Sequence, residues 1–177
     1  MTTIYLVRHG KVTYKDGDYI YGRKNIELDK DGLKQVSQLR EKILNYDFDV
    51  CYSSPLIRCV ETAFTLIGDR CLMLRDDRLI ERDMGQLVDK HNDDYDRVKY
   101  WDYSLNCSDL DVEPIQDVYK RSKDFLEYIL EKYPDKKVLV VSHSAIIKNI
   151  IKVLDNKKTL KYIPYCYFGE FSVDNLK

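Results

Sequence analysis

The sequence predicts an α/β fold: a three-layer sandwich with a mostly parallel central sheet and helices on both faces. Two observations predict it. Short apolar runs alternate along the chain with longer segments of helical period. Some of these runs, such as 137–142, are apolar at almost every position, which is typical of parallel strands covered on both faces. At 177 residues, 44% of them hydrophobic, we expect one domain with a substantial core over 1–177.

The first strand is predicted at 3–8, and a polar, aromatic loop follows it. The segment 29–46 then has helical period, and Asp29 or Asp31 can cap its start. The residues expected on the buried face of this helix are Leu33, Val36, Ile43 and Leu44.

A second buried strand is predicted at 48–52. Ser54 and Pro55 indicate a helix start, with serine as the N-cap and proline at the first helical position, where its missing N–H costs nothing. The helix continues to residue 67, and 70–75 is a third short strand.

The segment 86–113 is polar and acidic without a clear period, and we expect it to form a lid with one or two short helices. The segment 114–133 has the clearest helical period in the chain. The strand at 137–142 leads directly into a helix at 144–154, and 165–175 is predicted as an edge strand.

Composition excludes several classes of partner. The net charge of −1 provides no field that would attract nucleic acid or an anionic membrane, and the apolar runs are too short to span a bilayer. The five cysteines are odd in number and show no C-x-x-C spacing, which favours free thiols over disulfides or a zinc site. With no export signal at the start, we expect a cytoplasmic protein.

Polar side chains follow each of the four predicted parallel strands. Arg8 and His9 follow the first strand, Arg58 lies in the first turn after the second, Glu81 follows the third, and His143 follows the fourth. Because ligands bind outside the carboxyl ends of parallel strands, we expect these five groups to meet in one pocket. A single histidine or arginine at such a position more often packs against its neighbours or forms an ion pair. Five such groups at one edge of a sheet are harder to explain by coincidence. The third histidine, His91, is expected on the surface.

These groups fit the transfer of a phosphoryl group. Two arginines offer forked donors to phosphate oxygens, and His9 can attack phosphorus to form a phosphohistidine. His143 and the helix N-terminus after it can stabilise the transferring group. Glu81 can protonate the leaving oxygen and then accept a proton from water.

The same residues resemble a known family, the histidine phosphatase superfamily, whose fold is called phosphoglycerate mutase-like. "LVRHG" at 6–10 is similar to its signature, and "YSSPLIRCVETA", "LIERDMG" and "VLVVSHSAIIK" resemble three further blocks in the same order. The resemblance implies a phosphatase in which His9 is the nucleophile, Arg8, Arg58 and His143 bind phosphate, and Glu81 is the acid and base. It also implies no metal and no cofactor.

The substrate is expected to be a small phosphorylated metabolite. The sequence departs from the family pattern after Arg-His-Gly and after the acid block, at the pocket mouth, where Tyr14, Tyr21 and Arg23 are candidate substrate contacts. Only 61 residues separate Glu81 from His143, whereas mutases of the family carry an insertion there. The short interval favours hydrolysis over mutase-type transfer. The compact size of the chain is similar to that of the alpha-ribazole phosphatases.

The charge of the lid adds an expectation about the leaving group. Between residues 76 and 113 there are twelve acidic and five basic residues, which favours a neutral or cationic leaving group through local repulsion of anions.

Three alternatives stay open. One is a phosphoglycerate mutase-type transfer, and another is a phosphate-binding module without turnover. The third is a metal site built from His9, His143 and Glu81, which the two adjacent arginines disfavour. The sequence does not predict the oligomeric state.

Overall fold

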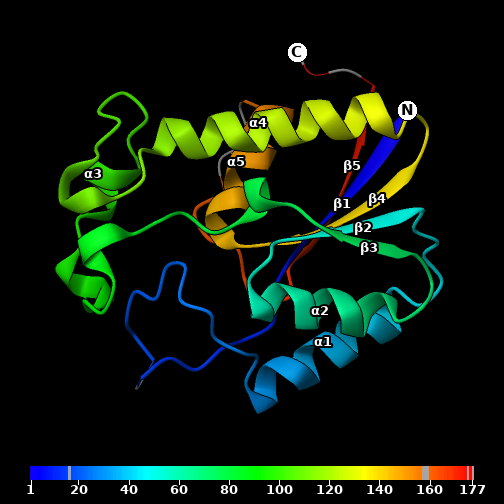
Figure 1. The fold of residues 1–177 in the computed structure, drawn as a ribbon, viewed down its shortest axis with the longest axis horizontal. Helices are drawn as coiled ribbons and strands as arrows, with labels where there is room; N and C mark the ends of the chain where they lie inside the picture. The colour runs from blue at the N-terminus through cyan, green and yellow to red at the C-terminus, as the bar shows by residue number, and fades with distance from the viewer. Residues whose placement is uncertain (16, 157–159, 175, 177) are drawn as a thin grey trace.

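A five-stranded sheet forms the centre of the molecule (Figure 1). The computed structural model describes residues 1–15, 17–156, 160–174 and 176. The strand order is β3-β2-β4-β1-β5, with β5 antiparallel to β1 and the other pairs parallel. The strands are β1 (Thr2–Arg8), β2 (Val50–Ser53), β3 (Leu72–Arg75), β4 (Lys137–Ser142) and β5 (Phe168–Val173). The predicted mostly parallel sheet and its edge strand near the C-terminus are confirmed, although Asn175 of the predicted segment lies outside the described residues.

Helices cover both faces of the sheet, as predicted (Figure 1). The helices α4 (Ile115–Lys132) and α5 (Ser144–Leu154) lie on one face, and α1 (Lys30–Lys42) and α2 (Ile57–Ile67) lie on the other. Alternate residues of β1 point into two cores: Ile4 and Leu6 pack with α4 and α5, while Tyr5 and Val7 pack with α1 and α2. This alternation explains why the buried strands are apolar at consecutive positions, as in 4–7 of β1 and 138–141 of β4.

The carboxyl ends of the parallel strands meet at one edge of the sheet. The register pairs Arg8 of β1 with Ser142 of β4, and Ser53 of β2 with Val141 of β4 and Arg75 of β3. Side chains that follow these four strands therefore start from neighbouring points.

The segment between β3 and α4 extends beyond this edge (Figure 1). It holds the short helix α3 (Arg97–Trp101) and four single 3-10 turns, at Asp77–Leu79, Gly85–Leu87, Asn92–Asp94 and Asp109–Asp111. A small core of its own ties it to the loop after β1, and this core consists of Ile20, Leu87, Tyr100, Cys107 and Val112. Within the described residues, no helix is both long and apolar enough to cross a membrane.

Two local predictions were wrong. In the predicted helix 29–46, whose helical part is Lys30–Lys42, Val36 and Ile43 are buried as expected, but Leu33 and Leu44 are 47% and 56% exposed. The buried face is completed by Gly32 and Leu39 in their place. In α2, the helix begins at Ile57 and not at Pro55, and its N-cap is Leu56 without a side-chain hydrogen bond. The Ser54 hydroxyl accepts from the Leu56 amide at 3.3 Å just before the helix, and it has a second, closer partner in His143. Asp29 caps α1, as predicted, by accepting from the Gly32 amide at 2.7 Å.

The chain after β1 packs directly against α1, and two glycines make this possible. A Cβ on Gly10 would lie 2.8 Å from Val36 Cγ2 and 2.9 Å from the Gly32 carbonyl oxygen. A Cβ on Gly32 would lie 2.1 Å from the carbonyl oxygen of Lys11. This close approach fixes the path of the chain immediately after His9.

We expect Gly32→Ala to lower the free energy of unfolding by about 1–3 kcal/mol, because the new methyl group meets the Lys11 backbone. At a helix position with open space the same change would stabilise the protein by about 1 kcal/mol. The sign of the change in unfolding free energy therefore shows whether Gly32 is in close contact with Lys11. Urea denaturation measures it, with Lys34→Ala on the exposed face of α1 as the control. A stabilised Gly32→Ala variant would contradict the close approach.

Candidate active site

Two histidines face each other at the carboxyl edge of the sheet. His9 follows β1 and His143 follows β4, its neighbour in the sheet. Their ring centroids are 5.2 Å apart with the planes at 64°, and both side chains are buried, with 1% and 0% exposed. The sequence prediction that these two imidazoles meet is therefore correct in its geometry.

Hydrogen bonds orient the two rings. Nδ1 of His9 lies 2.7 Å from the carbonyl oxygen of Gly10. A carbonyl oxygen only accepts, so Nδ1 carries the proton and Nε2 of His9 keeps a lone pair. Nε2 of His143 lies 2.7 Å from the Ser54 hydroxyl and 3.4 Å from Sγ of Cys59. Ser54, expected to cap a helix, instead fixes the second imidazole.

The surroundings keep both rings neutral. Burial lowers the pKa of His9 well below its usual value, and the positive charges of Arg58 and Arg8 lower it further. The pKa of His143 is lowered in the same way, first by burial and then by Arg58. Near pH 7 the Nε2 atom of His9 is thus a free nucleophile.

Two arginines complete the positive centre. Arg58 is fully buried in the first turn of α2, where it donates to the carbonyl oxygens of Gly22 (2.9 Å) and Lys24 (2.7 Å). Arg8 donates to the carbonyl oxygen of Ile163. In the described part of the chain neither guanidinium forms an ion pair with a carboxylate, and the Nε atom of each is buried without a hydrogen-bond partner. Buried charge of this kind is costly unless an anion accompanies it.

Glu81 is held beside this centre by its backbone. Its carbonyl oxygen accepts from Nε of Arg23 at 2.8 Å and from Nη2 of Arg121 at 3.4 Å, and both arginines also pair with Glu113. Its own carboxylate accepts from the Arg82 amide at 2.9 Å. Burial raises the pKa of the Cys59 thiol, which contacts His143, and the charge of Glu81 raises it further.

The three candidate substrate contacts take different positions. Tyr21 lies under Arg58, with 5.1 Å between the guanidinium carbon and the ring centroid, and burial raises the pKa of its hydroxyl. Tyr14 stacks edge-on against Tyr21 at 6.1 Å and donates to Asp89. Arg23 is engaged with the backbone and acidic groups around Glu81, including Asp83 at 3.5 Å. Tyr21 is therefore the one of the three that borders the arginines directly.

Sequence reasoning missed two groups that border the site. Tyr165 covers Arg8, with 4.0 Å from guanidinium carbon to ring centroid, and lies 5.7 Å from the ring of His9. It comes from the segment before β5, which carries no motif that would indicate a functional role. Lys148 of α5 contacts the ring of Trp101 at 4.4 Å. A lysine five residues after His143, between the apolar pairs Ile146–Ile147 and Ile150–Ile151, was a signal that could have been used.

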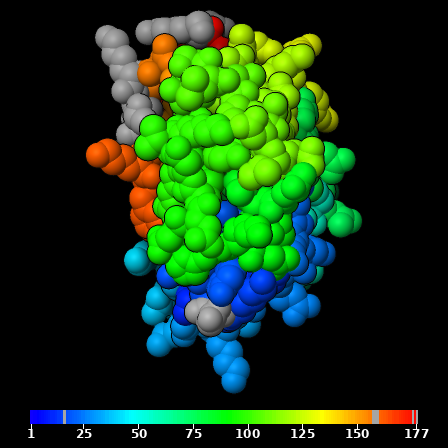
Figure 2. All heavy atoms as spheres, turned by 90° about the vertical axis from the view of Figure 1, so that its left-hand side faces the viewer, coloured from blue at the N-terminus to red at the C-terminus, as the bar shows by residue number. Residues whose placement is uncertain are grey.

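Five of the twelve acidic side chains between residues 76 and 113 form ion pairs with cations in the described chain. The pairs are Asp76–Arg78, Asp83–Arg23, Asp89–Lys15, Asp89–Lys24, Asp109–Lys99 and Glu113–Arg121. Arg82 is buried at 1% exposed, and Lys148 lies beneath α3 against Trp101. His91, expected on the surface, is half-buried and stacks edge-on against Tyr19 at 5.5 Å. On this side of the molecule the lid and the loop after β1 lie next to each other at the surface (Figure 2).

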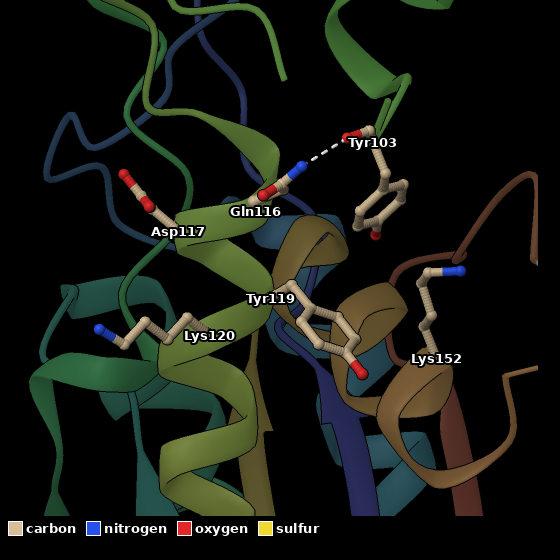
Figure 3. Close-up of a pocket in the computed structure, with 6 residues that line it drawn as sticks. All are labelled: Tyr103, Gln116, Asp117, Tyr119, Lys120 and Lys152. Carbon is tan, nitrogen blue, oxygen red and sulfur yellow. Dashed lines mark hydrogen bonds between the residues drawn. The ribbon is translucent and has the colours of Figure 1, made fainter. Parts of the chain in front are cut away.

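A surface hollow lies outside the site, where the lid meets α4 and α5 (Figure 3). It has a volume of about 460 Å³ and is lined by Tyr103, Gln116, Asp117, Tyr119, Lys120 and Lys152. The Gln116 amide donates to the carbonyl oxygen of Tyr103 at 2.7 Å, which joins the lid to α4. None of the residues at the strand ends lines this hollow. No group of three or more His, Cys, Asp or Glu residues in the described ranges is arranged to hold a metal ion.

Comparisons with known proteins agree with the geometry. The model of the family described as "Histidine phosphatase superfamily (branch 1)" matches residues 4–168. A "Metal-independent phosphoserine phosphatase" of Arabidopsis thaliana is 30% identical over 161 residues, which is 85% of this chain and 67% of the relative. A "2,3-bisphosphoglycerate-dependent phosphoglycerate mutase" of Rhizobium etli is 30% identical over 166 residues, 85% of this chain and 78% of the relative. The solved structure of Bacillus stearothermophilus YhfR has a TM-score of 0.82 at 24% identity and covers 98% of this chain and 92% of that one.

The lowered pKa values of the two buried histidines predict how stability depends on pH. In the unfolded chain each imidazole has a pKa of about 6.5, so the unfolded state binds protons first as the pH falls. Stability is therefore full above pH ~6.5 and is lost below it, by up to about 1.4 kcal/mol per pH unit for each ring.

Urea denaturation between pH 7.5 and 5 measures this loss. We expect His9→Asn to show a shallower slope than the wild type, and His91→Asn to keep the wild-type slope. Equal slopes in the wild type and His9→Asn would contradict the buried neutral state of His9.

Proposed function

Because this chain belongs to the histidine phosphatase superfamily, branch 1, we propose that it is a phosphomonoesterase that works through a phosphohistidine on His9. One observation carries the proposal: a neutral imidazole with a free Nε2 lies beside two buried guanidiniums whose Nε donors have no partner in the described chain. Unpaired buried guanidiniums of this kind match the several oxygens and the negative charge of a phosphate group.

The proposed reaction has two steps. Nε2 of His9 attacks phosphorus and the bond to the leaving oxygen breaks, while Arg8, Arg58 and His143 hold the phosphoryl oxygens. Glu81 gives a proton to the leaving oxygen. Water then attacks the phosphohistidine and loses a proton to the Glu81 carboxylate, which releases phosphate and restores His9.

No metal is assigned to this reaction, on the chemistry of the donor set. The imidazoles lie beside two guanidiniums, which repel a cation and supply the charge that a metal would otherwise bring to the phosphate. The "metal-independent" name of the Arabidopsis relative supports the same proposal.

The substrate is proposed to be a small phosphorylated metabolite. The relative named for phosphoserine makes that ester the first compound to test, with alpha-ribazole phosphate as a second. The mutase relative keeps phosphoglycerate mutase-type transfer as the alternative, but the 61-residue interval between Glu81 and His143 favours hydrolysis. The site lies within one proposed domain of 1–177, with residues 86–113 as its lid.

We expect His9→Ala to abolish hydrolysis of an aryl phosphate while the fold is retained, because the atom that attacks phosphorus is removed. Release of phosphate measures activity, and circular dichroism checks the fold. His91→Ala removes a histidine away from the site and serves as the control, and wild-type turnover is expected to survive a chelator. A folded His9→Ala variant with substantial activity would refute the nucleophile, whereas a wild type inactive on every ester would favour the silent binding module.

We expect Glu81→Gln to slow hydrolysis of an alkyl phosphate by about 10²–10⁴-fold, because the leaving alkoxide then lacks its proton donor. An aryl phosphate with an acidic phenol needs less protonation and is expected to recover part of this loss. The ratio of the two rates is the measurement, with the exposed Glu127→Gln as the control. Equal impairment of both substrates would argue against the acid role.

A further inference from the structure

Lys148 lies next to the proposed site without an acidic partner. It follows His143 by five residues in α5, and helical side chains lean toward the N-terminus of their helix, so it reaches back toward the carboxyl edge of the sheet. Its Nζ donates to the carbonyl oxygen of Lys161 at 2.8 Å and lies 4.4 Å over the ring of Trp101. Within the described ranges no carboxylate lies within ion-pair distance of it.

The ammonium group of Lys148 is electrostatically linked to the reacting groups. Burial lowers its pKa most, the charge of Glu81 raises it, and the charge of Arg8 lowers it. Backbone contacts also place Lys148 near Arg8. The carbonyl oxygen of Lys161 accepts from Lys148, and the carbonyl oxygen of Ile163, two residues further on, accepts from Arg8. One short segment thus holds a phosphate-binding arginine and, two residues away, a second cation.

Lys148 also has hydrogen-bonding capacity to spare. An ammonium group has three N–H donors, of which one goes to the carbonyl oxygen of Lys161 and one can face the Trp101 ring. A partly buried cation with an unused donor is stabilised by an anion that arrives with the substrate.

We propose that Lys148 binds a carboxylate on the leaving group, so that the preferred substrate is the phosphate monoester of a hydroxy acid or hydroxy amino acid. This inference rests on the proposed phosphatase function. The nearby Glu81 is the proton donor to the leaving oxygen, which places Lys148 on the leaving-group side of the site. A carboxylate matches the single charge of Lys148, whereas a second phosphate carries nearly two charges at pH 7.

The inference replaces the expectation of a neutral or cationic leaving group. That expectation counted the charges between residues 76 and 113 without regard to pairing, whereas five of the acidic side chains there are paired with cations in the described chain: Asp76, Asp83, Asp89, Asp109 and Glu113. Lys148 comes from α5, outside the counted segment, and it is held beneath the lid helix by Trp101.

The test compares two substrates that differ only by a carboxylate, O-phosphoserine and O-phosphoethanolamine. For the wild type we expect a higher kcat/KM with phosphoserine, and Lys148→Gln is expected to lower the ratio of the two values by about ten- to hundredfold. Lys148→Arg keeps the charge and is expected to restore part of the ratio. Lys152→Gln is the matched control, because Lys152 lies one turn further along α5, over Tyr103 at the outer hollow, and is expected to keep the wild-type ratio (Figure 3).

The outcomes separate this inference from the proposed function. Hydrolysis of both esters with a ratio near one, or an equal effect of Lys148→Gln on both, would overturn the role of Lys148 and leave the phosphatase intact. If neither ester is hydrolysed, calorimetric binding of the two compounds to the wild type and to Lys148→Gln decides the question. A preference for phosphoserine that is lost in Lys148→Gln supports the carboxylate contact, and equal affinities refute it.

Discussion

The arrangement depends on one electrostatic constraint: two guanidiniums are buried against two imidazoles, and no carboxylate pairs with either guanidinium in the described chain. Burial and positive charge together keep His9 and His143 unprotonated. The same charge makes the centre unfavourable until an anion enters it. The neutral state of the two imidazoles and the affinity for phosphate that we propose therefore have one origin.

The surrounding segments satisfy this constraint with backbone atoms in place of acids. Carbonyl oxygens of Gly22 and Lys24 accept from Arg58, and that of Ile163 accepts from Arg8. These dipoles hold the cations in place without cancelling their charge. Acidic groups lie one layer further out, where Glu113 binds the arginines that hold the Glu81 backbone.

The sequence was sufficient for the parts that depend on strand position. Because parallel strands end at one edge, the positions of Arg8, His9 and His143 after β1 and β4 predicted their meeting. The sequence did not predict contacts that depend on packing between distant segments. Ser54 reads as a helix cap by propensity, yet α2 begins three residues later and the hydroxyl binds His143. Tyr165 covers Arg8 from a segment without a motif, and a charge count along the lid could not tell which side chains face outward.

The most direct test of the account is to trap the reaction intermediate. The wild type is mixed with a phosphate monoester, quenched in alkali after a few milliseconds, and digested for peptide mass analysis. The account predicts one added phosphoryl group on the peptide that contains His9, stable in alkali and lost in acid. A phosphoryl group on any other residue would contradict it. So would steady hydrolysis of an aryl phosphate with an acidic phenol in which no phosphorylated peptide accumulates even in Glu81→Gln, because that ester needs little protonation in the first step while the second step lacks its base.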